Sequence, residues 1–311
     1  MISTMISFFH HAAVALDLSE ASDLIVECVS SFQNLGTKKI TLVTVLPVPF
    51  ENEGTELDTS KEQKQLGEYQ KALEKAGFEV DIHIRSGLHY YPPTEILTAA
   101  NEVNADFVVI SNRGQSKVLE LLSGGTSTEL LQRSKLPVYL INLDVQKDSE
   151  KAGGRFLTLP QPCSEAERHV LYATDFSDSA YRTYKVLRDM EGAGIVDKIS
   201  MIHVQGHHAI AIKDPVSRDR LTEQNREQLD RIRNKLSDRT REDTDLIITF
   251  GTPGKEIVDT AKERNATMIM MGSQGEGYVQ ELFLGSVSSK VTRLSDVPVL
   301  LIPAEQEKEE S

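Results

Sequence analysis

The sequence predicts an α/β fold, built twice in one chain, on two observations. In this chain of 311 residues, runs of Val, Ile, Leu and Met alternate with helical patterns, which is typical of parallel strands covered on both faces. The C-terminal parts of the two halves also repeat each other without gaps at an offset of 161 residues (271 minus 110), and nearer the starts residues 15–19 match 173–177 at an offset of 158. The matched segments are 110–114 with 271–275, 118–124 with 279–285, and 134–141 with 295–302. This repeat indicates two domains of ordinary size with the same fold.

The second half shows the elements most clearly. Strands are expected at the apolar runs 170–173, 199–204, 245–250, 267–271 and 299–302. Helices are expected from 177 or 178 to about 190, and at 217–236, 253–265 and 287–294. Ser177 or Asp178 suits the N-cap of the first helix, and Pro253 suits a first helical turn. Since ligands of such sheets bind beyond the carboxyl ends of the strands, the loops after Ala173, Val204 and Met271 should converge on a site.

The boundaries follow from breakers and composition. We expect a first domain at 1–144, a linker at 145–168, a second domain at 169–304 and a disordered acidic tail at 305–311. Gly153-Gly154 and the prolines at 160 and 162 mark the linker. The first eleven residues have some apolar character but neither a basic region nor a continuous apolar core, so they are not interpreted as a signal peptide.

Composition excludes several classes of function. The net charge of −13 disfavours a general nucleic-acid or anionic-membrane surface, and no apolar run approaches a membrane span. The arginines between 218 and 233 alternate with acidic residues, which favours a solvated helix face. Cys28 and Cys163 are the only cysteines and lie far apart, so we expect neither a disulfide framework nor a CxxC metal site. Unpaired cysteines fit a reducing cytoplasm, and a cytoplasmic protein is predicted.

The most informative motif lies between Met271 and Ser286. Gly272, Gly275 and Gly285-Ser286 have the spacing G-x2-G-x9-G-[ST], between a buried strand and a helix start. Glycines let backbone N–H groups approach an anion, and a helix N-terminus adds partial positive charge. The motif therefore predicts a phosphate cradle, and with it a nucleotide.

Rival interpretations of the motifs are weaker. No G-x4-G-K-[ST] occurs, and the segment from Gly275 lacks the third glycine of a dinucleotide fingerprint. Ser123 to Ser127 resembles the S-G-G-x-D-S loop of adenylating ATP pyrophosphatases, but Ser127 replaces its Asp and the segment is not at the first strand end. His203, His207 and His208 could hold a metal, but no cysteine or clear carboxylate partner is near in sequence, so no metal site is predicted.

Catalytic residues are not predicted. Asp175 is the only carboxylate that the pattern places near the phosphates, and no dedicated base, nucleophile or metal-held water can be assigned. At most, the sequence allows weak hydrolysis of the nucleotide or autophosphorylation at a nearby Ser or Thr.

The chain resembles the universal stress protein family, as a tandem of two domains. The resemblance rests on four features of the second half: the Ala173-Thr-Asp175 strand end, the Ile202-His-Val204 strand end, the full glycine motif and the closing run 297–302. The resemblance implies two Rossmann-like domains, of the adenine nucleotide alpha hydrolase-like type, each a five-stranded parallel-type sheet flanked by helices. It also implies ATP, alone or with Mg or Mn, at the carboxyl edge of the sheet. The residues implied to bind ATP are Ala173, Thr174, Asp175, Val204, Met271, Gly272, Ser273, Gly275, Gly285, Ser286, Val287 and Ser288.

Asp175 has an alternative role. In the resemblance it contacts the adenosine part of the ligand, but the same position could cap the following helix.

The first half departs from the motif. Ser111 replaces the first glycine and Gly125 stands where Ser286 does, whereas Asp17, Gly114 and Gly124 remain. Thr126 and Ser127 offer hydroxyls nearby, and Arg113 or Lys117 offers compensating charge. Because Ser111 adds a Cβ where backbone approach to the ligand is wanted, we expect a degenerate first site that is empty, weaker or used for another ligand. Its residues are Asp17, Ser111, Gly114, Gly124, Gly125 and Thr126.

Two hypotheses about function remain open. The first is a stress-response regulatory or protective module that binds adenine nucleotide in its second domain. The second is a nucleotide-independent adaptor or scaffold, or a binder of another small ligand or metal in one half. The resemblance further implies that the two domains pair internally through the strands 138–141 and 299–302, and a homodimer of chains is a further option. Neither nucleic acid nor a membrane is expected as a partner.

Overall fold

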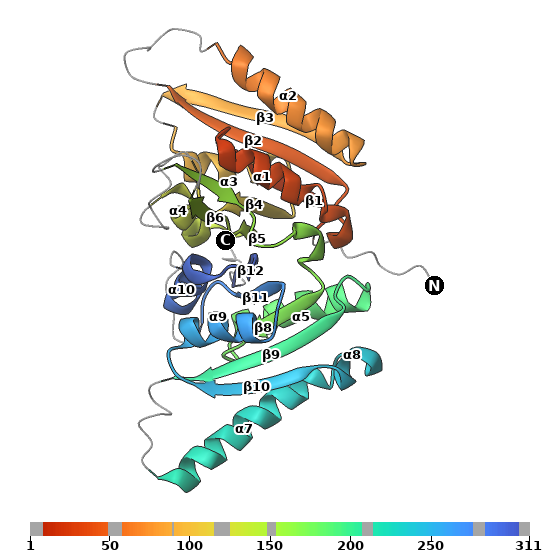
Figure 1. Ribbon diagram of the computed structural model, residues 1–311, viewed down its shortest axis with the longest axis vertical. Coiled ribbons are helices and arrows are strands. Elements are labelled where there is room, and N and C mark those ends of the chain that lie inside the picture. Colours follow the sequence, from red (N-terminus) through yellow and green to blue (C-terminus); the bar gives the residue numbers. More distant parts are fainter. Residues whose placement is uncertain are drawn as a thin grey trace, which may run out of the picture. The chain divides into compact units, whose positions relative to one another are not determined.

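The computed structural model of the chain describes residues 9–48, 58–88, 90–114, 125–147, 154–206, 214–275 and 284–304. The chain divides into two compact units, Met1–Ser164 and Glu165–Ser311. In each unit, helices flank a sheet (Figure 1). The acidic tail 305–311 and the histidines at 207 and 208 lie outside the described residues.

The first unit holds a parallel sheet in the order β3-β2-β1-β4-β5. Its strands are β1 (His11–Ala15), β2 (Lys39–Val48), β3 (Glu79–Leu88), β4 (Phe107–Ser111) and β5 (Val138–Ile141). Its helices are α1 (Glu20–Val29), the 3₁₀ turn η1 (Phe32–Leu35), α2 (Ser60–Lys75), α3 (Pro92–Glu102) and α4 (Thr126–Arg133). A two-stranded antiparallel hairpin follows, made of β6 (Asp144–Lys147) and β7 (Arg155–Thr158).

The second unit repeats this topology in the order β10-β9-β8-β11-β12. The 3₁₀ turn η3 (Cys163–Glu165) precedes its strands, which are β8 (His169–Ala173), β9 (Lys198–Gln205), β10 (Asp245–Phe250), β11 (Met268–Gly272) and β12 (Val299–Ile302). Its helices are α5 (Asp178–Gly192), α7 (Pro215–Arg233), α8 (Asp238–Glu242), α9 (Pro253–Glu263) and α10 (Ser286–Leu294). The predicted α/β fold is confirmed, whereas the short α8 and the turn η3 had no expected counterpart.

The central strands explain why the sequence pattern is so clear. Every residue of β4, β8 and β11 is buried, because helices cover both faces of these strands. The first strand of each unit ends in a sharp turn, in which Leu18 and Phe176 take the left-handed conformation with φ of 60° and 66°. Ser177 then caps α5, accepting a hydrogen bond from the N–H of Ala180. These turns connect the carboxyl ends of β1 and β8 to the N-termini of α1 and α5 within a few residues.

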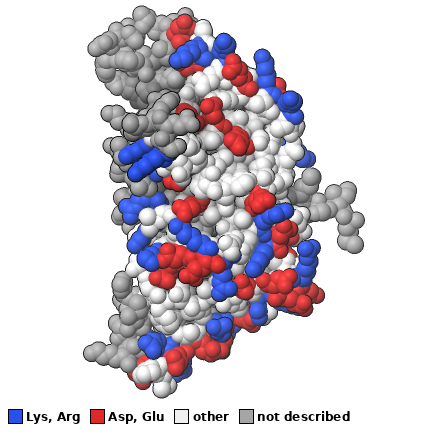
Figure 2. Space-filling model, viewed as in Figure 1, with Lys and Arg blue, Asp and Glu red and all other residues white. Residues whose placement is uncertain are grey.

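The charged surface matches the interpretation of the arginine-rich segment as a solvated helix face. On the face shown in Figure 2, Lys and Arg are interspersed with Asp and Glu rather than gathered. Within α7, Arg231 lies 3.6 Å from Glu227, and Arg233 pairs with Asp230. No helix in the described part of the chain is long and apolar enough to cross a bilayer.

The expectation that the two cysteines stay unpaired is wrong. Cys28 in α1 and Cys163 form a disulfide across a sequence separation of 135 residues, with their Cα atoms 5.0 Å apart. Separation along the chain did not indicate this pairing, because the segment expected to be a linker folds back onto the first unit. Leu157 of β7 is 8% exposed, and its N–H donates to Oε1 of Glu20 in α1 at 3.2 Å. Much of the segment 145–168 is therefore structured.

A buried histidine stands at the start of each first strand. Nε2 of His11 is hydrogen-bonded to Oγ1 of Thr41 at 2.8 Å, and Nε2 of His169 to Oγ of Ser200 at 2.9 Å. Burial lowers the pKa of both imidazoles, and a nearby lysine lowers it further, Lys39 for His11 and Lys198 for His169. Nearby acidic side chains raise the pKa. These are Asp81 and Asp106 for His11, and Asp245 for His169.

The two histidines predict acid sensitivity. Because the folded pKa lies below the unfolded value of about 6.5, the unfolded chain binds more protons, and stability is lost as pH falls below that value. The His11→Gln/His169→Gln variant should lose part of this dependence between pH 7 and 5, at most about 1.4 kcal/mol per pH unit for each histidine. Urea unfolding at each pH measures the free energy of unfolding and thus this dependence.

The comparison with wild type must be made at each pH, because Glu167 acts in the opposite direction. Burial raises the pKa of Glu167 to about 7, so its contribution to stability grows as pH falls through that value. Because Glu167 is present in both proteins, its contribution to the pH dependence cancels in the difference between them. Parallel pH profiles for wild type and the double variant would contradict the histidine assignment.

Candidate functional site

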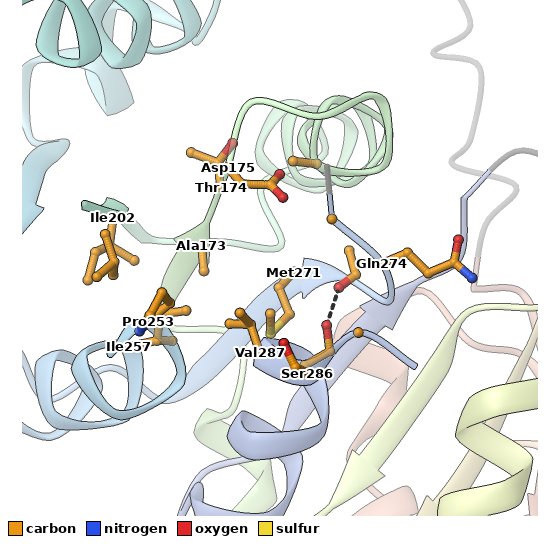
Figure 3. Close-up of a pocket in the computed structure, with 16 residues that line it drawn as sticks. Ala173, Thr174, Asp175, Ile202, Pro253, Ile257, Met271, Gln274, Ser286 and Val287 are labelled. Atoms are coloured by element: carbon orange, nitrogen blue, oxygen red, sulfur yellow. Dashed lines mark hydrogen bonds between the residues drawn. The ribbon is translucent and has the colours of Figure 1, made fainter. Parts of the chain in front are cut away.

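A cavity of about 260 Å³ opens at the carboxyl edge of the second unit's sheet. This volume is near the lower end of the range for small-molecule pockets, roughly 300–1,000 Å³. The lining residues come from the ends of β8, β9 and β11 and from the first turns of α5, α9 and α10 (Figure 3). They are Ala173, Thr174, Asp175, Ala180, Ile202, Val204, Pro253, Ile257, Met271, Gly272, Gln274, Gly275, Gly285, Ser286, Val287 and Ser288.

The structure thus brings together every predicted residue of the second half except Ser273. Ser273 does not line the cavity but ties its parts together: its N–H donates to the carbonyl of Ile302 at 2.9 Å, and its carbonyl accepts from the N–H of Gly285 at 2.8 Å. The second bond closes the two ends of the glycine-rich segment onto each other.

One end of the cavity is apolar. Ile202, Pro253 and Ile257 lie together at this end, with Gln274 at the opposite side of the view (Figure 3). Pro253 and Ile257 are four residues apart on α9 and therefore share one helix face. A flat, apolar ring system is the kind of group that such a surface can take from water.

The other end is formed by the N-terminus of helix α10. Gly285 is the N-cap of α10 and has no side chain to satisfy the first N–H groups of the helix, and the first turn carries no acidic residue. Ser286 is exposed there. Oγ of Ser288 donates to the carbonyl of Gly272 at 2.9 Å (dashed in Figure 3), which fixes the helix start against β11. Free N–H groups at a fixed helix N-terminus are a favourable position for a phosphate.

Asp175 lies between the two ends. Its Oδ1 accepts hydrogen bonds from the N–H of Ser177 at 3.1 Å and from Oγ of Ser177 at 2.6 Å. Ser177 is the N-cap of α5, so Asp175 orients the capping residue and does not cap the helix itself. The other oxygen, Oδ2, occupies the space that a Cβ on Gly275 would need. Gly275 is therefore explained by close approach to Asp175.

Gly272 has a different reason from the one that the sequence suggested. A Cβ on Gly272 would collide with Oγ of Ser179 and lie 3.1 Å from its Cβ, so it would meet helix α5. In the first half the corresponding residues are Ser111 and Ala21, at offsets of 161 and 158. In the second half the serine of this pair is Ser179 on helix α5, and in the first half it is Ser111 on strand β4. Ser111 therefore does not by itself exclude a ligand from the first half.

The first half keeps much of the same frame. Oδ1 of Asp17 accepts from the N–H of Ser19 at 3.0 Å and from its Oγ at 2.6 Å, and Oδ2 blocks a Cβ on Gly114. Oγ of Ser127 donates to the carbonyl of Ser111 at 2.7 Å, as Ser288 does to Gly272.

The differences between the halves lie at the starts of α4 and α10. Gly125 precedes α4 and lacks the hydroxyl of Ser286, and Thr126 begins the helix. Ser111 Oγ bonds back to the carbonyl of Arg113. Lys117 and Gly124 lie outside the described residues. The weaker first site stays a prediction.

His203 serves the architecture of the pocket edge. Its Nδ1 is hydrogen-bonded to the carbonyl of Thr174 at 3.0 Å, and its ring stacks on Phe176 with centroids 4.5 Å apart. Within the described ranges, no three His, Cys, Asp or Glu side chains are grouped as metal ligands would be.

Sequence reasoning missed Ala180, Ile202, Pro253, Ile257 and Gln274. Gln274 lies inside the glycine motif and could have been included on position alone. Pro253 and Ile257 have a detectable signal, because the repeat places Pro92 and Ile96 at the same offset of 161. Their four-residue spacing marks one helix face directed at the strand ends.

Comparison with known proteins decides the family. The sequence profile described as the universal stress protein family matches residues 9–142 and 167–303. This chain belongs to that family. Its two matches make it a tandem universal stress protein, a member of a stress-response family.

Several relatives resemble this universal stress protein over one or both halves. Universal stress protein MJ0577 of Methanocaldococcus jannaschii is 27% identical over 154 residues, which is 43% of this chain and 94% of the relative. A universal stress protein from Archaeoglobus fulgidus, solved as a crystal structure, matches with a TM-score of 0.64 and 27% identity, covering 96% of this chain and 98% of its own. A universal stress protein from Pseudomonas aeruginosa has a TM-score of 0.62 at 13% identity, covering 95% and 93%. The last similarity concerns the fold alone.

The packing of Gly272 against Ser179 predicts a steric exchange. Gly272→Ser should lower the free energy of unfolding by roughly 1–3 kcal/mol, because the added atoms overfill the contact with α5. Ser179→Ala in the same chain should restore most of this loss, and alone should be nearly neutral, since Oγ of Ser179 is buried without a hydrogen-bond partner among the described residues. Denaturant unfolding of the two single variants and the double variant measures the coupling.

The first half offers a matched control. Ala21→Ser faces Ser111 and should be destabilising, whereas Ala21→Ser with Ser111→Gly should recreate the second half's arrangement and be tolerated. If the changes in the free energy of unfolding of the two single variants simply added up in each double variant, in both halves, the predicted steric coupling would be wrong.

Proposed function

We propose that this tandem universal stress protein binds ATP or another adenine nucleotide in its second unit and acts as a stress-response regulatory or protective module. The observation that carries the proposal is a single cavity with an apolar end and, at its other end, a helix N-terminus whose N-cap is a glycine. An adenine ring suits the first and phosphates suit the second.

Each part of the nucleotide has a candidate partner. Ile202, Pro253 and Ile257 would cover the base, and the backbone of Val204 would face its edge. Asp175, held by Ser177, would accept from ribose hydroxyls. Ser286 and the first N–H groups of α10 would hold phosphate oxygens, with Mg or Mn as counter-ions where the triphosphate is bound.

The site supports binding better than turnover. Among the described residues that line the cavity Asp175 is the only carboxylate, and its Oδ1 is already engaged by Ser177. A general base needs a free oxygen within reach of a water, and a metal-held nucleophile needs a set of ligands. We therefore propose that nucleotide occupancy, more than hydrolysis, is the functional signal, in a cytoplasmic protein whose two halves pair internally.

Ligand release from purified protein tests the proposal. Protein prepared without added nucleotide is denatured, and any released ligand is identified by chromatography and mass spectrometry. ATP, ADP, AMP and cAMP are then titrated calorimetrically into emptied protein, with and without Mg²⁺. We expect one adenine nucleotide per chain. No adenine nucleotide carried or bound at physiological concentration would leave the nucleotide-independent adaptor as the better account.

Matched glycine variants locate the site. Gly275→Val places a side chain against Asp175 and should weaken ATP binding by about tenfold or more. Gly114→Val is its counterpart against Asp17 in the first half and should leave the measured affinity unchanged. Melting temperatures of both variants control for loss of fold. Two equal sites per chain in wild type, or equal losses from the two variants, would contradict a single functional site.

A further inference from the structure

Lys290 lies on helix α10, one helical turn beyond two residues that line the cavity. These are Ser286 and Val287, which precede Lys290 on the same helix. Residues at spacings of three and four are neighbours on one helix face, and side chains in a helix lean toward its N-terminus. The half-buried side chain of Lys290 is therefore directed along α10 toward the rim of the cavity.

The stem of Lys290 packs against the start of helix α9. A Cβ on Gly254 would lie 2.8 Å from Cβ, 3.0 Å from Cγ and 3.1 Å from Cδ of Lys290, so the glycine makes room for this side chain. Gly254 directly follows Pro253, which lines the apolar end of the cavity. In the first unit Pro93 stands at the position that corresponds to Gly254, so this room belongs to the second unit.

This position is unfavourable for a cation whose charge is not balanced. The N-terminus of α9, against which the stem packs, carries partial positive charge, as does the nearby N-terminus of α10, and both repel an ammonium group. Lys255, in the first turn of α9, is paired with Asp259, whereas the part of the chain that the structure describes offers Lys290 no ion-pair partner. An anion bound at the rim of the cavity would relieve this repulsion.

The first unit carries the opposite charge at the corresponding place. Glu129 of α4 corresponds to Lys290, since 290 minus 161 is 129. Glu129 accepts a hydrogen bond from the hydroxyl of Tyr91 and lies 3.4 Å from Arg133. An acidic group suits the start of a helix, and this one already has its partners within the unit. The duplicated frame therefore carries an unbalanced cation beside the cavity of the second unit and a balanced acid in the first.

We propose that Lys290 holds the outer phosphates of the nucleotide and makes the second unit selective for adenine nucleotides with a polyphosphate chain, over AMP and cAMP. The inference rests on the proposed function, because it names the class of nucleotide that the same cavity takes. The cavity of about 260 Å³ is small, so a nucleotide with its base at the apolar end extends its phosphate chain out of it, across the exposed Ser286. The first phosphate then lies at the N–H groups of α10, and the later ones come within reach of the flexible stem of Lys290.

The selectivity follows from charge. Adenine and ribose are common to ATP, ADP, AMP and cAMP, so contacts with Ile202, Pro253 and Asp175 treat these four ligands alike. Each further phosphate adds negative charge, and a lysine acts on phosphate as a point charge. Lys290 therefore strengthens the binding of ATP and ADP much more than that of the monophosphates.

Calorimetric titration of ATP, ADP, AMP and cAMP into full-length variants tests the role of Lys290. Lys290→Gln should weaken ATP binding by about tenfold and AMP binding by less than about twofold. Lys290→Glu, which carries the charge of Glu129, should weaken ATP binding by about a hundredfold. The matched control is Arg293→Gln, which removes one charge from the exposed last turn of the same helix and should change each affinity by less than about twofold.

The protein without nucleotide gives a second reading. Because the charge of Lys290 is unfavourable there, Lys290→Glu should raise the melting temperature by about 1–3 °C in the absence of ligand, although the same variant weakens ATP binding. A lysine that only supported the fold would give the opposite result, a lower melting temperature together with weaker binding of all four nucleotides.

Three results would overturn the role of Lys290 and leave the proposed function standing. One is an equal change in ATP and AMP affinity in Lys290→Gln. Another is a loss of ATP affinity in Arg293→Gln as large as that in Lys290→Gln. The third is a lower melting temperature of Lys290→Glu without nucleotide. If wild type binds none of the four nucleotides, the proposed function itself fails, and the selectivity fails with it.

Discussion

The second unit depends on one close approach, in which the two glycines at and after the end of β11 lie directly against side chains of the segment after β8. Oδ2 of Asp175 fills the place of a Cβ on Gly275, and Oγ of Ser179 fills the place of a Cβ on Gly272. This contact brings an apolar surface, a carboxylate and a helix N-terminus to a single cavity. A side chain at Gly275 would displace the carboxylate of Asp175, and a side chain at Gly272 would collide with Ser179 on α5.

The same frame stands in both halves, but with different chemistry. Asp17 and Asp175 make the same two bonds to a following serine, and Ser127 and Ser288 fix the same helix start. What differs is a hydroxyl at the start of the last helix of each unit, present at Ser286 and absent at Gly125. Duplication has thus kept the scaffold, which is held by packing, and varied a surface position that packing does not constrain.

Much of the fold and of the pocket follows from the sequence. Apolar runs placed β10 and β12 at their observed bounds, and the glycine spacing selected residues that do line one cavity. These features are local or periodic, so they can be recognised from the order of residues along the chain.

Only the tertiary structure decided three other matters. It showed that Gly272 makes room for Ser179, that Pro253 and Ile257 complete the pocket, and that Cys28 meets Cys163. Each depends on which segments lie side by side after folding, and a disulfide between residues 135 apart leaves no trace in spacing or composition. The sequence determined the elements and the motif, because these depend on neighbours along the chain. The folded structure decided the contacts between segments, because these depend on neighbours in space.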